Sequence, residues 1–260
     1  VAAGVIECFE NVLEANTLDP DDIVFIGHST TQATNALLEG DVAKIGVLGM
    51  GGGGLEGMLA KSQSNIPDID LGTGRMIHTC HTYLKLKDVN EKSIEAEMAR
   101  LGAQGATVIV ASKVFGVDSI REENMVRAVA EKKGLLVCAA SDISKLYGLS
   151  RRTRTAAING SILPKMMDTA NSTEQSVRQA RIKAPLMIMR GDGGVMNIAE
   201  MKKRPVLTML SGPAASVMGA LLYLRASNGI YFEVGGTSTN LGVNKNGRPA
   251  GDYTVGGGPR

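Results

Sequence analysis

Short apolar segments alternate with helical segments along most of this chain. The apolar runs are Asp22–Ile26, Lys44–Leu48, Thr107–Ala111, Leu135–Ala139 and Pro185–Met189. Segments with helical spacing lie around them, at about residues 4–16, 33–38, 92–101 and 120–132. A strand, a loop, a helix and a second strand at this spacing are typical of a parallel sheet covered by helices. The sequence therefore predicts an α/β fold with mixed sheets flanked by helices.

A long helical segment extends from Arg151 to about Ile182. Pro164 lies inside it and predicts a break or a kink, because proline lacks the N–H that an inner helical turn uses. Arg151, Arg152 and Arg154 form a basic patch at the start of this segment. A solvated helix face is the simplest expectation for this patch, and contact with an acidic partner or a neighbouring subdomain is the alternative.

Two regions are expected along the chain. Residues 1–185 would form a first α/β region, and residues 186–260 would begin a second one. The chain starts at Val1, without an initiator methionine and with helical spacing already under way, and it stops in the glycine-rich stretch Gly256–Arg260. Both ends are therefore expected to be cuts within a longer protein.

Composition excludes several classes of function. The net charge of the 260 residues is +2 and tryptophan is absent, which argues against nucleic acid or an anionic membrane surface as a partner. No apolar run approaches the roughly 18–20 residues that span a membrane. The three cysteines, Cys8, Cys80 and Cys138, are far apart and odd in number. They predict reduced thiols, and hence a cytoplasmic protein.

The segment from Tyr231 to Val243 carries the densest signal for chemistry. An apolar strand ends at Glu233 and Val234, and the residues that follow are Gly235, Gly236, Thr237, Ser238 and Thr239. The glycines permit a tight turn, whose N–H groups and hydroxyls suit phosphate oxygens. A carboxylate at the strand end, here Glu233, can hold Mg²⁺ or orient a water. The alternative is an ordinary Gly-Gly hairpin. Asn246-Gly247 adds a further hairpin signal.

Two other turns carry polar residues where α/β proteins place ligands. Ser211, Gly212 and Pro213 begin a helix, with Ser211 as the expected N-cap, and a helix N-terminus favours an anion. A well-capped helix without a ligand is the alternative. Asp192 follows the apolar run that ends at Met189, where a carboxylate could take part in chemistry. The alternative is a plain Asp-Gly turn.

A polar cluster follows the first predicted strand. His28, Thr30, Thr31 and Asn35 lie at a strand-to-helix junction. Their hydroxyl and amide groups could hold a polar ligand, such as a carboxylate, through neutral hydrogen bonds. The alternative is that Thr30 or Thr31 caps the helix, with His28 as a local hydrogen-bond partner.

Two further motifs match known binding patterns, but the residues around them do not support a binding site. Gly49–Gly54 fits the G-x-G-x-x-G dinucleotide pattern, but Asp68 and Asp70 lie in a predicted loop rather than at a strand end, so a mobile surface loop is expected. His78–His81 would place its ligands on both faces of a strand, with no fourth ligand nearby, so a metal site is not expected. No Gly-Lys-Ser/Thr sequence is present, which excludes a Walker P-loop.

Five stretches together carry a family resemblance. They are His28–Glu39, Arg152–Asn159, Met189–Gly194, Arg204–Ala214 and Glu233–Asn240. The first is similar to the motif His-Gly-Thr-Thr-x-x-Thr-Asn-Ala-Leu-Leu-Glu, and the last to Asp-x-Gly-Gly-Thr-Ser-Thr-Asp. These motifs occur in the same order in the N-terminal region of the hydantoinase A / ATP-dependent 5-oxoprolinase family, which includes acetone carboxylase β-type subunits. The chain resembles that region over nearly its whole length.

The resemblance implies an actin-like ATPase (ribonuclease H-like) fold, in which two related α/β halves hold a nucleotide. A first Asp-x-Gly-Gly-Thr loop would then precede Val1, and an adenosine-contacting segment would follow Arg260, so an incomplete fragment is expected. Glu233 and Asn240 stand where the family has aspartates. Glutamate reaches one methylene further than aspartate, and asparagine carries no charge.

The resemblance also implies roles for the residues already singled out. ATP phosphates would contact Gly235, Gly236, Thr237, Ser238, Thr239, Ser211 and Gly212. Glu233 would be the metal ligand and a catalytic residue. Asp192 is a second candidate catalytic residue, because of its place after an apolar strand. The substrate would face His28, Thr30, Thr31 and Asn35.

The implied function is ATP-dependent hydrolysis of a cyclic amide such as a hydantoin or 5-oxoproline, with Mg²⁺ and with a hydantoinase B-type partner subunit or domain. Phosphoryl transfer to the amide oxygen would make the ring carbon electrophilic toward water. The isolated fragment is expected to be inactive. Two alternatives stay open: an acetone-carboxylase-like ATP-dependent subunit that phosphorylates a ketone or bicarbonate, and an ATPase that reactivates or regulates another enzyme.

Overall fold

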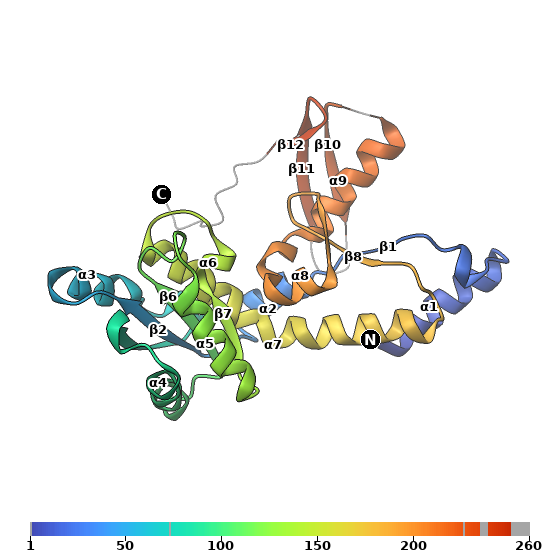
Figure 1. Cartoon of the computed structure of the whole chain (residues 1–260). Coiled ribbons are helices and arrows are strands. Elements are labelled where there is room, and N and C mark those ends of the chain that lie inside the picture. Colours follow the sequence, from blue (N-terminus) through green and yellow to red (C-terminus); the bar gives the residue numbers. More distant parts are fainter. Residues whose placement is uncertain (1, 73, 226, 235–238, 251–260) are drawn as a thin grey trace. The chain divides into compact units, whose positions relative to one another are not determined.

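The computed structural model describes residues 2–72, 74–225, 227–234 and 239–250 (Figure 1). Its helices are α1 (Ala2–Ala15), α2 (Gln32–Glu39), α3 (Gly54–Ser64), α4 (Glu91–Ala103), α5 (Arg121–Lys132), α6 (Ala140–Ile143), α7 (Leu149–Gln179), α8 (Ile198–Lys203) and α9 (Ser211–Leu224). Its strands are β1 (Ile26–His28), β2 (Ile45–Gly51), β3 (Ile69–Asp70), β4 (Met76–Ile77), β5 (Thr79–Lys85), β6 (Val108–Lys113), β7 (Leu136–Ala139), β8 (Leu186–Met189), β9 (Val195–Asn197), β10 (Gly229–Val234), β11 (Thr239–Lys245) and β12 (Arg248–Ala250). Short 3-10 helices are η1 (Pro20–Asp22), η2 (Leu86–Asp88) and η3 (Pro205–Thr208).

The chain divides into two compact units. Unit 1 comprises residues 1–34, 168–202 and 207–260, and unit 2 comprises residues 35–167 and 203–206. Unit 1 is thus assembled from segments that lie on either side of unit 2 in the sequence. This division does not fall at residue 185, and the two regions expected at 1–185 and 186–260 stay a prediction.

Unit 2 is built around a parallel sheet with the strand order β5-β2-β6-β7. Every residue of the central strand β2 is buried, as expected for a parallel sheet that is covered on both faces. Leu48 and Met50 face the core formed with α4 and α5, which includes Ile94 and Val126. On the opposite face, a β-carbon added to Gly160 of α7 would lie 3.3 Å from the Ile45 side chain, so α7 covers this face closely. Successive residues of β2 therefore pack against α4 and α5 on one face of the sheet and against α7 on the other.

Helix α7 differs from its prediction at two places. It runs from Leu149 to Gln179 with Pro164 inside it, so the helix does not break there, and the alternative of a kink stays a prediction. Arg152 is buried rather than solvated: its guanidinium donates to the Lys113 carbonyl oxygen at 2.7 Å and to the Leu146 carbonyl oxygen at 3.2 Å. The predicted solvated patch is therefore wrong for Arg152, whereas Arg151 and Arg154 are exposed.

Unit 1 contains a small mixed sheet with the order β1-β8-β9. Strands β1 and β8 are parallel, with His28 beside Ile188, and β9 returns antiparallel to β8. Strand β1 begins four residues later than predicted, and η1 covers Pro20–Asp22, which includes the first residue of the predicted strand. The core of this part comprises Ile26 from β1, Val177 from α7, and Ala180 and Ile182 from the segment that follows α7.

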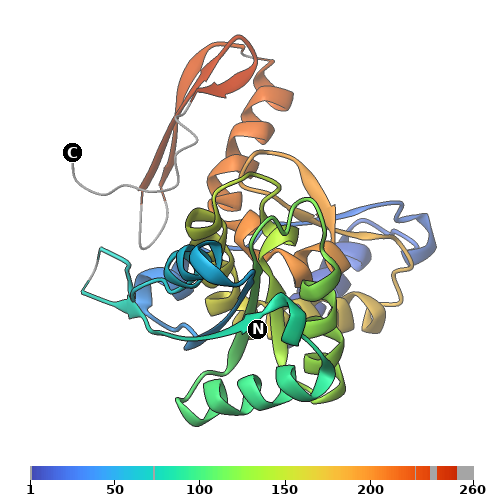
Figure 2. The ribbon, with the colours of Figure 1, turned by 60° about the vertical axis from the view of Figure 1, so that its left-hand side comes forward.

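Unit 1 also contains an antiparallel sheet with the order β10-β11-β12, and α9 packs beside it in both views (Figures 1 and 2). The predicted hairpins are confirmed. Val234 pairs with Thr239 across the first turn, and Asn246 and Gly247 have φ angles of 53° and 71°, which suit a two-residue turn between β11 and β12. Within the part of the chain that the structure describes, no helix is both long and apolar enough to cross a membrane.

Candidate functional site

The loops after β1 and β8 begin at the same edge of their sheet. Because these strands are parallel, their carboxyl ends lie together, where α/β proteins commonly place ligands. The loop after β1 carries Ser29, Thr30 and Thr31 and leads into α2, and the loop after β8 is the turn Arg190–Gly194. The structure thereby brings two of the predicted polar segments to one edge.

Ser211, the first residue of α9, joins the β1–α2 loop. It is fully buried, and its hydroxyl donates to the Thr30 carbonyl oxygen at 2.9 Å. The Thr30 N–H and the Ser29 hydroxyl each approach the Ser211 oxygen at 3.4 Å. The structure therefore brings together Ser211 and Thr30, two residues that the sequence analysis assigned to phosphate and to substrate.

The expected N-cap role of Ser211 is wrong. Leu210 occupies the cap position, with a left-handed φ of 58° and no capping side chain of its own. Its N–H instead donates to the Thr34 hydroxyl of α2 at 3.2 Å. A side chain at the start of each helix thus bonds the backbone at the start of the other helix.

The remaining loop residues surround this junction. The Thr30 hydroxyl accepts from the Gln32 N–H at 3.2 Å, which is a local turn that leads into α2. Capping of α2 by Thr30 or Thr31 stays a prediction. Thr31 is exposed, and its methyl group would be 3.5 Å from a β-carbon added to Gly212. Asn35 is exposed on α2, four residues after Thr31. The N-termini of α2 and α9 meet at this loop, and both helix dipoles favour a negative charge beside them.

His28 ends β1 and is half-buried. Burial lowers the pKa of its imidazole below the ordinary value of 6.5, so the ring is neutral at neutral pH. A neutral imidazole can donate one hydrogen bond and accept another, but it adds no fixed positive charge to this edge.

The Asp192 carboxylate bonds to groups of its own turn. One carboxylate oxygen accepts from the Gly194 N–H at 3.0 Å, and the other forms an ion pair with Arg190. The Arg190 N–H closes the turn on the Gly194 carbonyl oxygen at 2.8 Å. This is the geometry of the predicted Asp-Gly turn, and a catalytic role of Asp192 stays a prediction.

The predicted phosphate loop falls largely outside the described residues. Gly235, Gly236, Thr237 and Ser238 belong to that gap. The structure gives the backbone of Glu233 and Thr239, with Glu233 paired to Asn240 across β10 and β11. The strand-turn-strand arrangement is therefore confirmed, and the contacts of the loop stay a prediction.

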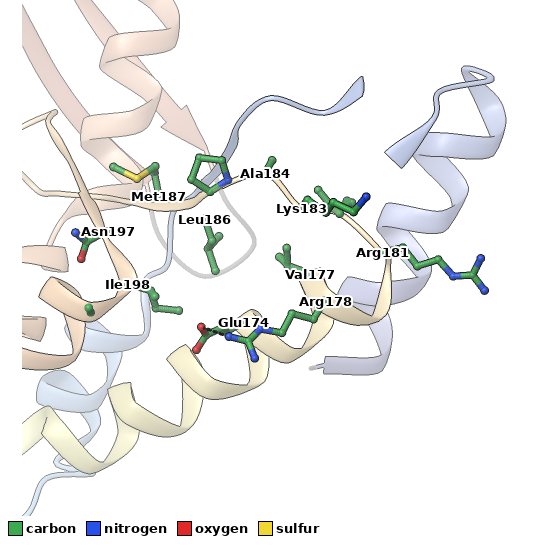
Figure 3. A pocket seen from close by; sticks show the side chains of 13 residues that line it. Glu174, Val177, Arg178, Arg181, Lys183, Ala184, Leu186, Met187, Asn197 and Ile198 are labelled. Atoms are coloured by element: carbon green, nitrogen blue, oxygen red, sulfur yellow. Dashed lines mark hydrogen bonds and ion pairs between the residues drawn. The ribbon is translucent and has the colours of Figure 1, made fainter. Parts of the chain in front are cut away.

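A cavity of about 700 Å³ lies elsewhere in unit 1, between α7 and strands β8 and β9 (Figure 3). Val177, Leu186 and Ile198 point into it, and the ion pair between Glu174 and Arg178 lies along its edge. None of the predicted site residues lines it. Its size suits a small molecule, but the convergent hydroxyls and helix starts are at the β1–α2 loop, so we place the candidate site there.

The structure also shows the surroundings of the glycine and histidine motifs in unit 2. The turn after β2 is only Gly52 and Gly53, too short for the expected mobile loop. Asp68 accepts from the Thr79 N–H at 2.8 Å and from His78 at 2.7 Å, and neither it nor Asp70 ends a strand of the parallel sheet. The segment at Asp70 is the short strand β3 rather than a loop.

Sequence reasoning missed the role of Asn159 in the Arg152–Asn159 motif. Its side-chain oxygen accepts from the Val206 N–H at 3.1 Å, and its amide nitrogen donates to the Lys203 carbonyl oxygen at 3.1 Å. Asn159 is fully buried, so these contacts fix the segment that leads into η3. The signal available was a single asparagine directly after the apolar residues Ala156, Ala157 and Ile158 of a helical segment.

Two family models match the chain. The model of the hydantoinase/oxoprolinase N-terminal region matches residues 1–134, and the model of hydantoinase/oxoprolinase matches residues 152–259. Caprolactamase subunit alpha of Pseudomonas jessenii is 23% identical over 240 residues, which cover 85% of this chain and 34% of that protein. An uncharacterized protein of Methanocaldococcus jannaschii is 23% identical over 176 residues, covering 65% of this chain and 26% of that protein.

Two solved structures share the fold. Nucleotide-free acetone carboxylase superposes with a TM-score of 0.70 and 20% identity, covering 95% of this chain and 39% of that chain. ATP-dependent caprolactamase from Pseudomonas jessenii superposes with a TM-score of 0.63 and 20% identity, covering 92% of this chain and 38% of that chain. The chain thus spans 26% to 39% of the length of these relatives. The predicted α/β, actin-like fold is confirmed, and with one family model matching residues 1–134 and the other 152–259, the chain belongs to the hydantoinase/oxoprolinase family.

Proposed function

We propose that the protein containing this chain hydrolyses a cyclic amide with ATP, by phosphorylating the amide oxygen so that the ring carbon becomes electrophilic toward water. Family membership is the first support. The observation that carries the proposal is the junction of α2 and α9, where two helix N-termini and the hydroxyls of Thr30, Thr31 and Ser211 meet beside one loop.

The residues divide into two sets of roles. The β10–β11 turn, with Thr237 and Ser238, would bind the phosphates of ATP through hydroxyls and N–H groups. His28, Thr31 and Asn35 would hold the ring of the substrate through neutral hydrogen bonds. A neutral His28 fits this role, because it can pair with an uncharged amide without needing a counter-ion.

Magnesium accompanies ATP in this proposal, with Glu233 as its protein ligand. Asp192 fits a direct metal contact poorly, since its carboxylate already binds Arg190 and the Gly194 N–H. Among the described residues no three His, Cys, Asp or Glu side chains are grouped closely enough to hold a metal. ATP oxygens and water would therefore supply most of the coordination of Mg²⁺.

A partner subunit is part of the proposal. The caprolactamase relative is named as a subunit alpha, and this chain matches it over 85% of its own length. A hydantoinase B-type subunit or domain would then complete the ring-opening reaction.

The test is a stoichiometric assay with MgATP and three rings: 5-oxoproline, hydantoin and ε-caprolactam. We expect one ADP for each ring opened, and no ADP without a ring. The variant Thr237→Ala should weaken ATP binding about tenfold, the loss expected for about one hydrogen bond to a charged group. Thr155→Ala is the matched control, because the Thr155 hydroxyl bonds only within α7, to the Arg151 carbonyl oxygen.

Two results would contradict the proposal. The first is ATP turnover that responds to acetone and bicarbonate but to none of the rings, which would assign the protein to ketone activation. The second is ATP turnover only in complex with another enzyme whose activity it restores, which would make it a reactivating ATPase.

A further inference from the structure

Two helix starts hold each other at the candidate site. Ser211 at the start of α9 bonds the backbone of the β1–α2 loop, with its hydroxyl 2.9 Å from the Thr30 carbonyl oxygen. In return Thr34, in the first turn of α2, accepts from the Leu210 N–H at 3.2 Å. We name this pair of contacts the reciprocal clamp.

The clamp replaces local capping. Leu210 has no side-chain oxygen, so the first N–H groups of α9 have no cap from their own N-cap residue. Leu210 also adopts a left-handed φ of 58°, a conformation that costs a residue with a β-carbon about 1 kcal/mol. A backbone held in such a state requires contacts that fix it, and the Thr34 hydroxyl supplies one.

A second pair of contacts fixes the same loop from its own side. The Thr30 hydroxyl accepts from the Gln32 N–H at 3.2 Å, and the Gln32 side-chain oxygen accepts from the Thr169 hydroxyl of α7 at 2.6 Å. The Thr30 peptide is therefore held at both its carbonyl oxygen and its side chain. Thr31, the next residue, remains exposed.

We propose that Ser211 and Thr34 are positioning residues, whose clamp presents Thr31 and the start of α2 to the ring substrate. This inference rests on the proposed function. Neither hydroxyl needs to touch the ring, because both are already engaged with backbone groups. Loss of the clamp lets the loop after Thr30 take several arrangements, which lowers the fraction of bound rings in a reactive position.

The prediction separates two kinetic constants. Ser211→Ala and Thr34→Val lower kcat and raise the KM of the ring. Thr34→Val leaves the KM of ATP unchanged, because Thr34 lies outside the β10–β11 turn and carries no phosphate role. Thr34→Ser keeps the hydroxyl and retains the wild-type values. Ser216→Ala is the control on α9, since Ser216 is half-buried on the same helix.

Amide hydrogen exchange tests the clamp without relying on activity. We expect the Thr30 and Leu210 amides to exchange about tenfold faster in Ser211→Ala and Thr34→Val respectively, the change expected for one lost neutral hydrogen bond. The amides of the unit 2 strand β6 should exchange at the wild-type rate in both variants. Equal acceleration at β6 would show general destabilisation and overturn the proposal.

The two proposals fail in different ways. If the wild-type protein turns over no ring, the proposed function fails, and the exchange rates alone still decide whether the clamp orders the loop. If the wild-type protein is active and both variants keep its kcat and ring KM, the positioning role is overturned although the function stands.

Discussion

Gly191 lies so close to the Met209 carbonyl oxygen that a β-carbon on Gly191 would overlap with it. The Gly191 N–H also donates to the Leu207 carbonyl oxygen at 2.8 Å. These contacts fix the turn after β8 against the segment that leads into α9. The requirement for glycine here is one of space rather than of backbone angle.

Gly191→Ala should lower the free energy of unfolding by about 2 kcal/mol or more, because backbone atoms must move to admit the methyl group. Gly219→Ala in α9 is the matched change, and nothing lies within 4 Å of its added carbon. It should raise the stability by about 0.5–1 kcal/mol through helix propensity. Urea unfolding of both variants measures the difference, and equal losses would contradict the steric argument.

Asn159→Ala should destabilise the protein by about 2 kcal/mol, because the Val206 N–H and the Lys203 carbonyl oxygen lose their buried partner. Asn124→Ala serves as the control, since Asn124 is exposed on α5. Its effect should stay within about 0.5 kcal/mol. Shifts of the denaturant midpoint, at an unchanged slope of free energy against denaturant concentration, give the change in stability for both variants. A wild-type midpoint for Asn159→Ala would mean that these two bonds contribute nothing.

Stability should fall as the pH drops from 6.5 to 4, because of His81. Burial lowers the pKa of His81 from 6.5 to about 4, and its ring is 2.9 Å from the Ser64 hydroxyl. Between these two pH values the unfolded chain takes up a proton that the folded chain does not, so unfolding is favoured. The contribution of His81 to stability is fully present above pH 6.5. Below pH 4, His81 adds no further slope to the dependence of stability on pH.

His81→Gln should flatten the pH dependence of the thermal midpoint in this window. His28 shifts in the same direction as His81, so a residual slope of the same sign is expected. An unchanged slope in His81→Gln would place the titration elsewhere.

Thiol reagents should distinguish the cysteines. Cys8 is exposed, whereas Cys138 is buried and its pKa is raised by burial to about 12. Because only the thiolate reacts, Cys138 should stay unmodified at pH 8 until the protein unfolds. Mass spectrometry after a brief treatment should find Cys8 labelled. Early labelling of Cys138 in folded protein would contradict its burial.

The sequence predicts those features that local residues determine. Asn246-Gly247 indicates a tight turn because both residues tolerate a positive φ, and the structure has that turn. The apolar run at Lys44–Leu48 predicts the central strand, since its residues suit burial on both faces. The polar loop after β1 is predicted because hydroxyls precede a helical pattern.

Features that depend on distant partners could not be predicted. Ser211 has the local pattern of an N-cap, but its hydroxyl bonds Thr30, which lies 181 positions away. Arg152 has the charge of a surface residue, but two backbone carbonyl oxygens stabilise its buried guanidinium. Pro164 stays inside α7 because Ile162, Leu163 and Met166 are buried around it, and this burial outweighs a cost of about 3 kcal/mol.

The interleaved order of the two units has a consequence for folding during synthesis. Unit 2 is nearly continuous in sequence, so its sheet can form as soon as residues up to about 167 have left the ribosome. Unit 1 must wait, because β1 needs β8 and the Thr30 loop needs Ser211. Until then α1 and β1 expose Phe9, Leu13 and Ile26, the apolar side chains of their later core. A nascent chain that pauses between these points is the form of this protein most in need of a chaperone.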